Sequence, residues 1–173
     1  SQLIVSFVLL ITVYAAHSNS EVITSTDSMW SIFLARSLIV DGDISLNEYR
    51  PLIKARNKYG LRKRRGQFYN YFPPGTALIA VPFVWLYEQF PETISPLIPG
   101  VKWQTETASY PSAEQVSMPL ERAIASLVIA LTTALLFIFL NTFCSFWLSL
   151  LFATLFAFAS PAWSIASRGL WQH

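Results

Sequence analysis

Two long apolar stretches, separated by only five residues, dominate the last third of the sequence. The first covers residues 123–140, the second covers residues 146–166, and neither contains a charged side chain. A helix needs about 20 residues of this kind to cross the hydrocarbon core of a bilayer. We therefore predict transmembrane helices over residues 122–141 and 146–166, joined by a tight turn as an antiparallel hairpin.

The composition favours a membrane protein over a soluble domain. Hydrophobic residues make up 53% of the chain and charged residues only 13%, whereas soluble domains carry about 25% charged residues. Eight of the twelve Lys and Arg residues fall between Arg50 and Arg65. This segregation is typical of a membrane protein with one long polar loop, so we predict an all-α, polytopic fold. The single cysteine, Cys144, excludes a disulfide within the chain.

The first sixteen residues form a shorter apolar run. No basic residues precede it, so it does not have the pattern of a secretory signal peptide. It is also too short to span ~30 Å of hydrocarbon. We expect residues 1–16 to be a truncated first transmembrane helix, and the chain to be the N-terminal part of a larger polytopic protein.

Residues 17–71 are polar and are predicted to be a loop that carries juxtamembrane helices. Hydroxyl groups at residues 24–26 suit the N-terminus of a helix near Asp27, and residues 41–43 are expected to be turn residues that end it. Within this helix apolar residues recur three or four positions apart, on a face that excludes Arg36: Trp30, Phe33, Leu34 and Leu38. Such a helix suits either a membrane surface or packing on its own protein. Residues 48–67 lack apolar periodicity, so we expect a loop there, with a short helix as the alternative.

A further apolar segment, residues 74–90, is interrupted by Pro82 and has Glu88 near its end. It suits a short spanning helix or a helix that lies on the membrane surface, and the proline and the acid favour the surface helix. Residues 91–119 contain five prolines and are predicted to be an irregular loop. If residues 74–90 lie on the surface, His173 returns to the membrane face that carries Asp27.

The densest group of charges is the run Arg62-Lys63-Arg64-Arg65, on the same polar loop as Asp27. Basic runs are usually solvated anchors, and the positive-inside rule would place this one in the cytoplasm. An acidic residue near a membrane, followed by a basic cluster, also suits chemistry on a lipid-linked phosphate, because Arg and Lys stabilise phosphate charge where water is scarce. Nothing in the pattern indicates binding of nucleic acid.

Five segments of the sequence follow one another in an order that points to a known type of membrane protein. They are an apolar helix, Thr26-Asp27-Ser28 at the head of an amphipathic helix, Asp41-Gly42-Asp43, Phe72-Pro73-Pro74-Gly75, and a hydrophobic hairpin. This order resembles the start of the GT-C membrane glycosyltransferases, most of all bacterial and archaeal relatives of the protein O-mannosyltransferases and of the lipid A aminoarabinose transferase. The resemblance covers most of the chain, and Leu170–His173 also looks like a segment common in such proteins.

The resemblance implies a multi-pass protein of a prokaryotic inner membrane with an extracytoplasmic first loop, since long loops can translocate despite their charge. By resemblance, the catalytic residue is Asp27. Members of the family often have Asp-Glu there and His or Lys directly before the Pro-Pro pair, whereas this chain has Ser28 and Phe72. Substrate contacts are therefore expected from the basic cluster and from the end of the chain: Lys63, Arg64, Arg65, Trp171 and His173.

The activity that the resemblance implies is transfer of a sugar from a polyprenyl phosphate to an extracytoplasmic lipid, glycan or protein acceptor. A general base accelerates such reactions by about 10² to 10⁴, but Asp27 could instead be a first-turn acid that complements a helix dipole. The alternative is a non-enzymatic transporter or flippase-like protein whose basic loop binds the anionic headgroups of membrane lipids. The sequence has no Gly-rich phosphate loop and no zinc spacing, so no cofactor is predicted, and a divalent metal stays open.

Overall fold

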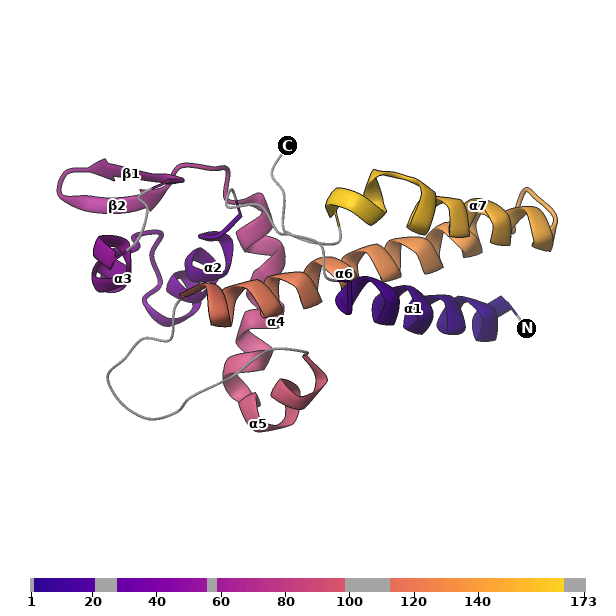
Figure 1. Ribbon diagram of the computed structural model, residues 1–173, viewed down its shortest axis with the longest axis horizontal. Helices are drawn as coiled ribbons and strands as arrows, with labels where there is room; N and C mark the ends of the chain where they lie inside the picture. The colour runs from indigo at the N-terminus through magenta and orange to yellow at the C-terminus, as the bar shows by residue number, and fades with distance from the viewer. Residues whose placement is uncertain (1, 21–27, 56–58, 99–112, 167–173) are drawn as a thin grey trace. The chain divides into compact units, whose positions relative to one another are not determined.

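The computed structural model describes residues 2–20, 28–55, 59–98 and 113–166 of the chain (Figure 1). These residues are mostly helical, in agreement with the predicted class. They divide into two compact units. We call Ser1–Ile23 together with Arg122–Gly169 the helical unit, and Thr24–Glu121 together with Leu170–His173 the hairpin unit.

The helical unit is built from three helices and one short turn. They are α1 (Gln2–Ser18), the part of α6 (Ala113–Leu140) from Arg122 onward, α7 (Phe146–Ala159) and the π-helical turn η3 (Ala162–Ala166). Its core is made of small and branched residues: Val13, Ile129, Ala130, Ala157 and Ala162. Alanine at these positions lets the helix backbones approach closely. Large apolar side chains point outward instead, among them Leu3, Phe7, Leu135 and Phe152.

In the described part of the chain, one helix is long and apolar enough to cross a membrane by length and composition, namely Met118–Leu140 within α6. It coincides with the first predicted span, residues 122–141. The loop predicted over residues 91–119 is wrong at its end, because α6 already begins at Ala113 and continues through Pro119. Residues 113–118 include Ala, Glu, Gln and Met, which are strong helix formers. The helix therefore runs through Pro119, although the prolines of this segment had predicted an irregular loop there.

Residues 141–145 connect α6 to α7. Near this connection the rings of Phe137 and Phe146 lie 5.8 Å apart between centroids, and farther along both helices Ile129 and Ala157 share one core cluster. The two helices are therefore antiparallel neighbours. The backbone N–H of Cys144 bonds to the Leu140 carbonyl at 2.8 Å, which closes the turn at the end of α6.

The span predicted over residues 146–166 is corrected by a break after Ala159. Pro161 disfavours helical backbone in the residue before it, and Ser160 is extended, with φ −116° and ψ 173°. Pro161 also has no N–H to bond to the carbonyl of Ala157, four residues back. That carbonyl accepts a hydrogen bond from Nε2 of His17 at 3.1 Å. The His17 ring is fully buried, and its centroid lies 4.8 Å from that of Trp163. Thus α1 supplies the donor that α7 lacks.

The hairpin unit contains shorter elements in a fixed order. They are α2 (Ser31–Val40), the 3₁₀ turn η1 (Asn47–Tyr49), α3 (Arg50–Ala55), β1 (Leu61–Arg64), β2 (Gln67–Asn70), α4 (Gly75–Gln89), α5 (Pro91–Ile94) and the 3₁₀ turn η2 (Ser95–Leu97). The core of the unit gathers apolar residues from most of these elements: Met29, Trp30, Leu34, Leu46, Tyr49, Leu52, Ile53 and Ala77.

Helix α2 packs on α4, which is a single helix through Pro82. The hydroxyls of Ser31 and Thr76 are 3.2 Å apart, and Arg36 Nε lies 2.8 Å from Glu88 Oε1. The apolar face predicted for α2 also packs on its own protein, because Trp30 and Leu34 belong to the core of the hairpin unit and Phe33 and Leu38 pack against it. The helix begins at Ser31, and the hydroxyl-rich residues 24–26 expected to cap it lie outside the described residues.

The basic cluster forms a short β-hairpin within a mostly helical chain, where a loop was predicted over residues 48–67. The alternative of a short helix in that segment is met by α3 (Arg50–Ala55). Strand β1 pairs antiparallel with β2, with Arg62 opposite Tyr69 and Arg64 opposite Gln67. On the other side of β2, the Leu46 N–H bonds to the Phe68 carbonyl at 2.8 Å. The physical reason is that Leu61 and Phe68 pack against the core of the hairpin unit. Two apolar residues in eight are too few to show a strand period in the sequence.

Candidate functional site

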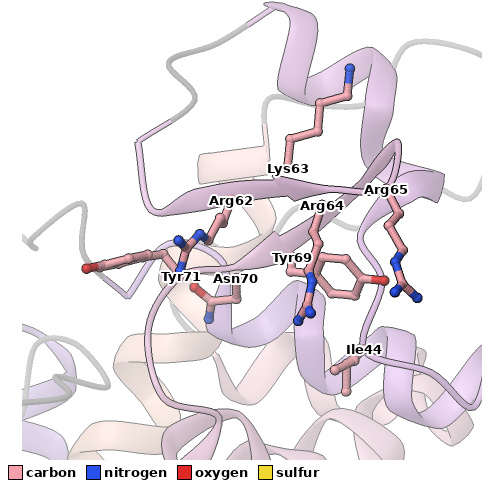
Figure 2. A pocket seen from close by; sticks show the side chains of 8 residues that line it. All are labelled: Ile44, Arg62, Lys63, Arg64, Arg65, Tyr69, Asn70 and Tyr71. Atoms are coloured by element: carbon pink, nitrogen blue, oxygen red, sulfur yellow. The ribbon is translucent and has the colours of Figure 1, made fainter.

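The two faces of the β-hairpin carry different side chains. Directly paired residues in an antiparallel ladder point to the same side, so Arg62 and Arg64 share one face with Tyr69. The Lys63 side chain points to the other face, where its Nζ lies 5.9 Å from the centroid of the Phe68 ring. Figure 2 shows Arg62, Arg64 and Arg65 directed to the same side of the hairpin, away from Lys63.

This arginine-bearing face borders an open cavity of about 930 Å³. Its lining combines cations, tyrosines, one amide and one aliphatic residue: Ile44, Arg62, Lys63, Arg64, Arg65, Tyr69, Asn70 and Tyr71. The Asn70 side-chain oxygen accepts a hydrogen bond from the Phe72 N–H at 3.2 Å. Its Nδ2 is buried and has no hydrogen-bond partner among the described residues. We call this cavity the hairpin pocket.

The cations of the hairpin pocket differ from the arginine inside the same unit. Arg36 bonds to Glu88 at 2.8 Å and to the Tyr49 hydroxyl at 3.3 Å. Burial by itself lowers the pKa of Arg36, but these hydrogen bonds outweigh it and hold that pKa above its ordinary value. Within the described residues, Arg36–Glu88 is the one ion pair, so no described carboxylate neutralises the hairpin arginines. A cavity with unneutralised guanidinium groups is suited to bind an anion.

The tip of the hairpin holds Arg65 in an unfavourable backbone conformation. The turn consists of Arg65 and Gly66, with φ values of 49° and 84°, and two-residue hairpin turns of this kind favour Asn, Asp or Gly. Among the residues that the structure describes, Arg65 is the one residue other than glycine that has a positive φ. The turn is braced from α3, because Arg50 Nη2 donates to the Gly66 carbonyl at 2.9 Å. The chain thus keeps a cation at a position where a smaller residue would be less strained.

The base of the hairpin is fixed by close packing on α2. Trp30 is fully buried, and its indole N–H donates to the Tyr59 carbonyl at 2.9 Å. Gly60 has φ +74°, and a Cβ added there would lie 3.1 Å from the Phe72 ring and 3.2 Å from Trp30. Phe72, the residue directly before the Pro-Pro pair, is therefore a packing residue at the foot of the hairpin.

Two of the predicted phosphate ligands, Arg64 and Arg65, line the hairpin pocket with their side chains on one side. Lys63 borders the same pocket, but its side chain is on the opposite face. Arg62 was not predicted as a ligand, although the two-residue period of a strand would have grouped it with Arg64. Asp27, Trp171 and His173 lie outside the described residues.

The acidic residues near α2 have structural contacts. Asp41 caps the C-terminus of α2, where its N–H bonds to the Ser37 carbonyl. Asp43 Oδ1 accepts the backbone N–H of Ser45 at 2.7 Å, as expected of a turn residue. Among the residues that the structure describes, no three His, Cys, Asp or Glu side chains are grouped closely enough to hold a metal ion.

Comparison with protein-family models, with curated protein sequences and with solved structures gave no match for this chain.

Proposed function

We propose that the hairpin pocket binds the phosphate of a polyprenyl-phosphate sugar, and that the chain belongs to a membrane glycosyltransferase. The observation that carries this proposal is the set of three guanidinium groups, from Arg62, Arg64 and Arg65, on one side of a cavity with no described acidic partner. Guanidinium groups are donors suited to the two charged, non-bridging oxygens of such a phosphodiester.

Guanidinium groups suit the departing phosphate for two reasons. Their planar forks donate two parallel hydrogen bonds to phosphate oxygens. They also carry a fixed positive charge, which stabilises the negative charge that grows on the phosphate as the bond to the sugar breaks. The base that takes the acceptor proton is Asp27 in this proposal, and this assignment rests on the resemblance.

The membrane setting is part of the same proposal. The candidate span Met118–Leu140 supports membrane association. A multi-pass topology in a prokaryotic inner membrane, an extracytoplasmic hairpin pocket and a lipid, glycan or protein acceptor follow from the resemblance. Trp171 and His173 are proposed to lie near the sugar, on the membrane face that carries Asp27.

A turnover assay tests the proposal. The full-length protein in detergent would be given a panel of short-chain polyprenyl-phosphate hexoses and pentoses, and release of polyprenyl phosphate would be followed. We expect Asp27→Asn to lower kcat by about 10² or more while donor binding is retained. Replacing Arg64 and Arg65 by Gln is expected to raise KM for the donor. Matched controls are Asp41→Asn for the acid and Lys63→Gln for the cations, and neither is expected to change turnover.

The competing function is non-enzymatic binding of anionic lipid by a transporter or flippase-like protein. The open shape of the hairpin pocket suits headgroup binding as well as it suits catalysis, because headgroup binding needs cations but no base. The two functions differ at Asp27. If wild type releases no polyprenyl phosphate from any donor, and Asp27→Asn binds lipid phosphate as the wild type does, the non-enzymatic function replaces the first.

A further inference from the structure

Helix α4 uses only one of its faces inside the hairpin unit. Residues three and four positions apart on this helix are buried on the side of α2: Ala77, Ala80, Val84 and Tyr87. The opposite side carries large apolar residues that are open to the surroundings, namely Leu78 (56% exposed), Ile79 (52%), Trp85 (49%) and Leu86 (43%). This second group also recurs at helical spacing, so it forms a continuous apolar stripe, which we call the outer face of α4.

The outer face of α4 carries no charge. Glu88 is the one charged residue of α4, and its carboxylate is held by Arg36 of α2 at 2.8 Å. Beyond the end of the helix Phe90 (54%) and Leu97 (68%) are also exposed, with the exposed acidic residue Glu92 between them in the chain. A continuous, uncharged, aromatic-containing face of this extent indicates an interaction surface rather than scattered surface hydrophobics.

Charge complementarity selects the partner for this face. Only Tyr71–Pro74 separate β2 from α4, so the hairpin arginines lie close in sequence to the start of the apolar helix. Cations that lie close in the chain to a large apolar helical face are the combination that binds a bilayer containing anionic lipids. The chain also contains a candidate membrane span, Met118–Leu140. A purely protein partner would have to match both an uncharged stripe and a set of unneutralised arginines.

We infer that the outer face of α4 lies against the acyl chains of a bilayer of anionic phospholipid. The charged hairpin cannot enter hydrocarbon, so it stays at the level of the headgroups, where lipid-borne phosphate is found. This assignment rests on the proposed function for the phosphate site, and it adds which face of α4 lies in the bilayer and the level at which the hairpin stands. It requires neither Asp27 nor sugar transfer.

The test is site-directed spin labelling of the full chain in vesicles of phosphatidylethanolamine and phosphatidylglycerol. Single cysteines would replace Leu78 and Leu86 in a Cys144→Ser background, and collision of the nitroxide with oxygen and with a water-soluble nickel chelate would be measured. Two reference sites complete the set: Leu135, an exposed residue inside the candidate span, and Gln67, an exposed residue of the hairpin.

We expect labels at Leu78 and Leu86 to behave like the label at Leu135, with high oxygen and low nickel accessibility. Nickel accessibility as high as at Gln67 would show that α4 faces water, and low accessibility to both reagents would show that protein covers it. Either result overturns the inference.

A second measurement needs no substitution. Photolysis of a phospholipid with a diazirine in its acyl chain should label the outer face of α4 in wild-type protein, and should spare Ala80 and Val84. Absence of label from α4, with α6 labelled in the same sample, also contradicts the inference. Lipid contact at α4 without phosphate affinity at the hairpin pocket would instead reject the proposed function and leave this inference intact.

Discussion

The helical unit and the hairpin unit satisfy their polar groups in different ways. In the helical unit the described hydroxyls bond to carbonyls of their own helix, as Thr133 does to Ile129 at 2.8 Å and Thr154 to Leu150 at 2.8 Å. The bond from His17 of α1 to the Ala157 carbonyl of α7 is the exception. In the hairpin unit polar side chains join separate segments. Ser37 Oγ donates to the Ser45 carbonyl at 2.7 Å, and Arg36 reaches from α2 to Glu88 of α4.

This difference matches two kinds of surroundings. Self-contained hydrogen bonding is what a helix requires where no water is present. Bonds between segments require one specific tertiary arrangement. Charged side chains that take no part in these bonds remain exposed, where they can bind a ligand. We therefore propose that the helical unit lies in hydrocarbon and that the hairpin unit presents charge to a ligand.

Trp30→Ala should produce the largest loss of stability, and should do so in the hairpin unit. Trp30 is fully buried between α2 and the base of the hairpin, and truncation of such a residue costs about 3 to 5 kcal/mol. The control is Trp147→Ala on α7, because Trp147 is 76% exposed and should change stability by about 0.5 kcal/mol or less. Chemical denaturation in mild detergent, followed by circular dichroism, gives both values. Equal losses for the two variants would contradict the assigned core.

Ile129→Arg tests whether the helical unit belongs in a membrane. Ile129 is buried near the middle of the candidate span Met118–Leu140. A charge at the centre of a bilayer costs about 2.5 to 3.5 kcal/mol on insertion scales. Insertion of residues 113–145, measured by glycosylation mapping, should fall sharply for Ile129→Arg and stay normal for the control Asn141→Arg beyond the span. Unchanged insertion of Ile129→Arg would remove the basis for a membrane-embedded helical unit.

The bond between His17 and the break in α7 gives a smaller and more specific effect. His17→Phe keeps an aromatic ring against Trp163 but leaves the Ala157 carbonyl without its donor, which costs about 1 to 3 kcal/mol. Pro161→Ala restores a backbone N–H that can bond to that carbonyl. In a double-mutant cycle the His17→Phe penalty should therefore shrink in the Pro161→Ala background. Additive losses would show that the hydrogen bond does not contribute as described.

Arg65→Asn should be the one stabilising change. Asn tolerates the positive φ of this turn position better than Arg does, so we expect a gain of about 1 kcal/mol or less, measured by denaturation. The same variant should bind lipid phosphate more weakly, because a guanidinium is lost from the hairpin pocket. A variant that is both more stable and equally able to bind would show that Arg65 is strained without benefit to binding.

The sequence was most informative where structure is local. Uncharged apolar runs predicted α6 and the beginning of α7, and the spacing of Trp30, Leu34 and Leu38 predicted the buried side of α2. The break at Ser160 was missed because Pro161 lies inside a run that is apolar throughout. The hairpin was missed because its two apolar residues gain their burial from the distant Trp30 and Leu46, and such contacts leave no period in the sequence.

For the site, the sequence placed cations in the correct segment without resolving their faces. A run of four basic residues reads as one cluster, and only strand pairing separates Lys63 from Arg62 and Arg64. The unneutralised state of these arginines could not be predicted either. It depends on the tertiary positions of the acidic residues, such as Glu88, whose partner Arg36 is 52 positions away in the chain.

The central claim is that one face of the hairpin binds lipid-borne phosphate, and the affinity of two charge-matched variants tests it most directly. Dissociation constants for a short-chain polyprenyl phosphate would be measured with wild type, Arg64→Gln and Lys63→Gln, each variant losing one cation from the same strand. We predict that Arg64→Gln weakens binding about tenfold or more, as expected for loss of a charge-assisted hydrogen bond. Lys63→Gln should change affinity by about twofold or less, the effect of a screened surface charge. Equal effects of the two substitutions, or no effect of Arg64→Gln, would contradict the account.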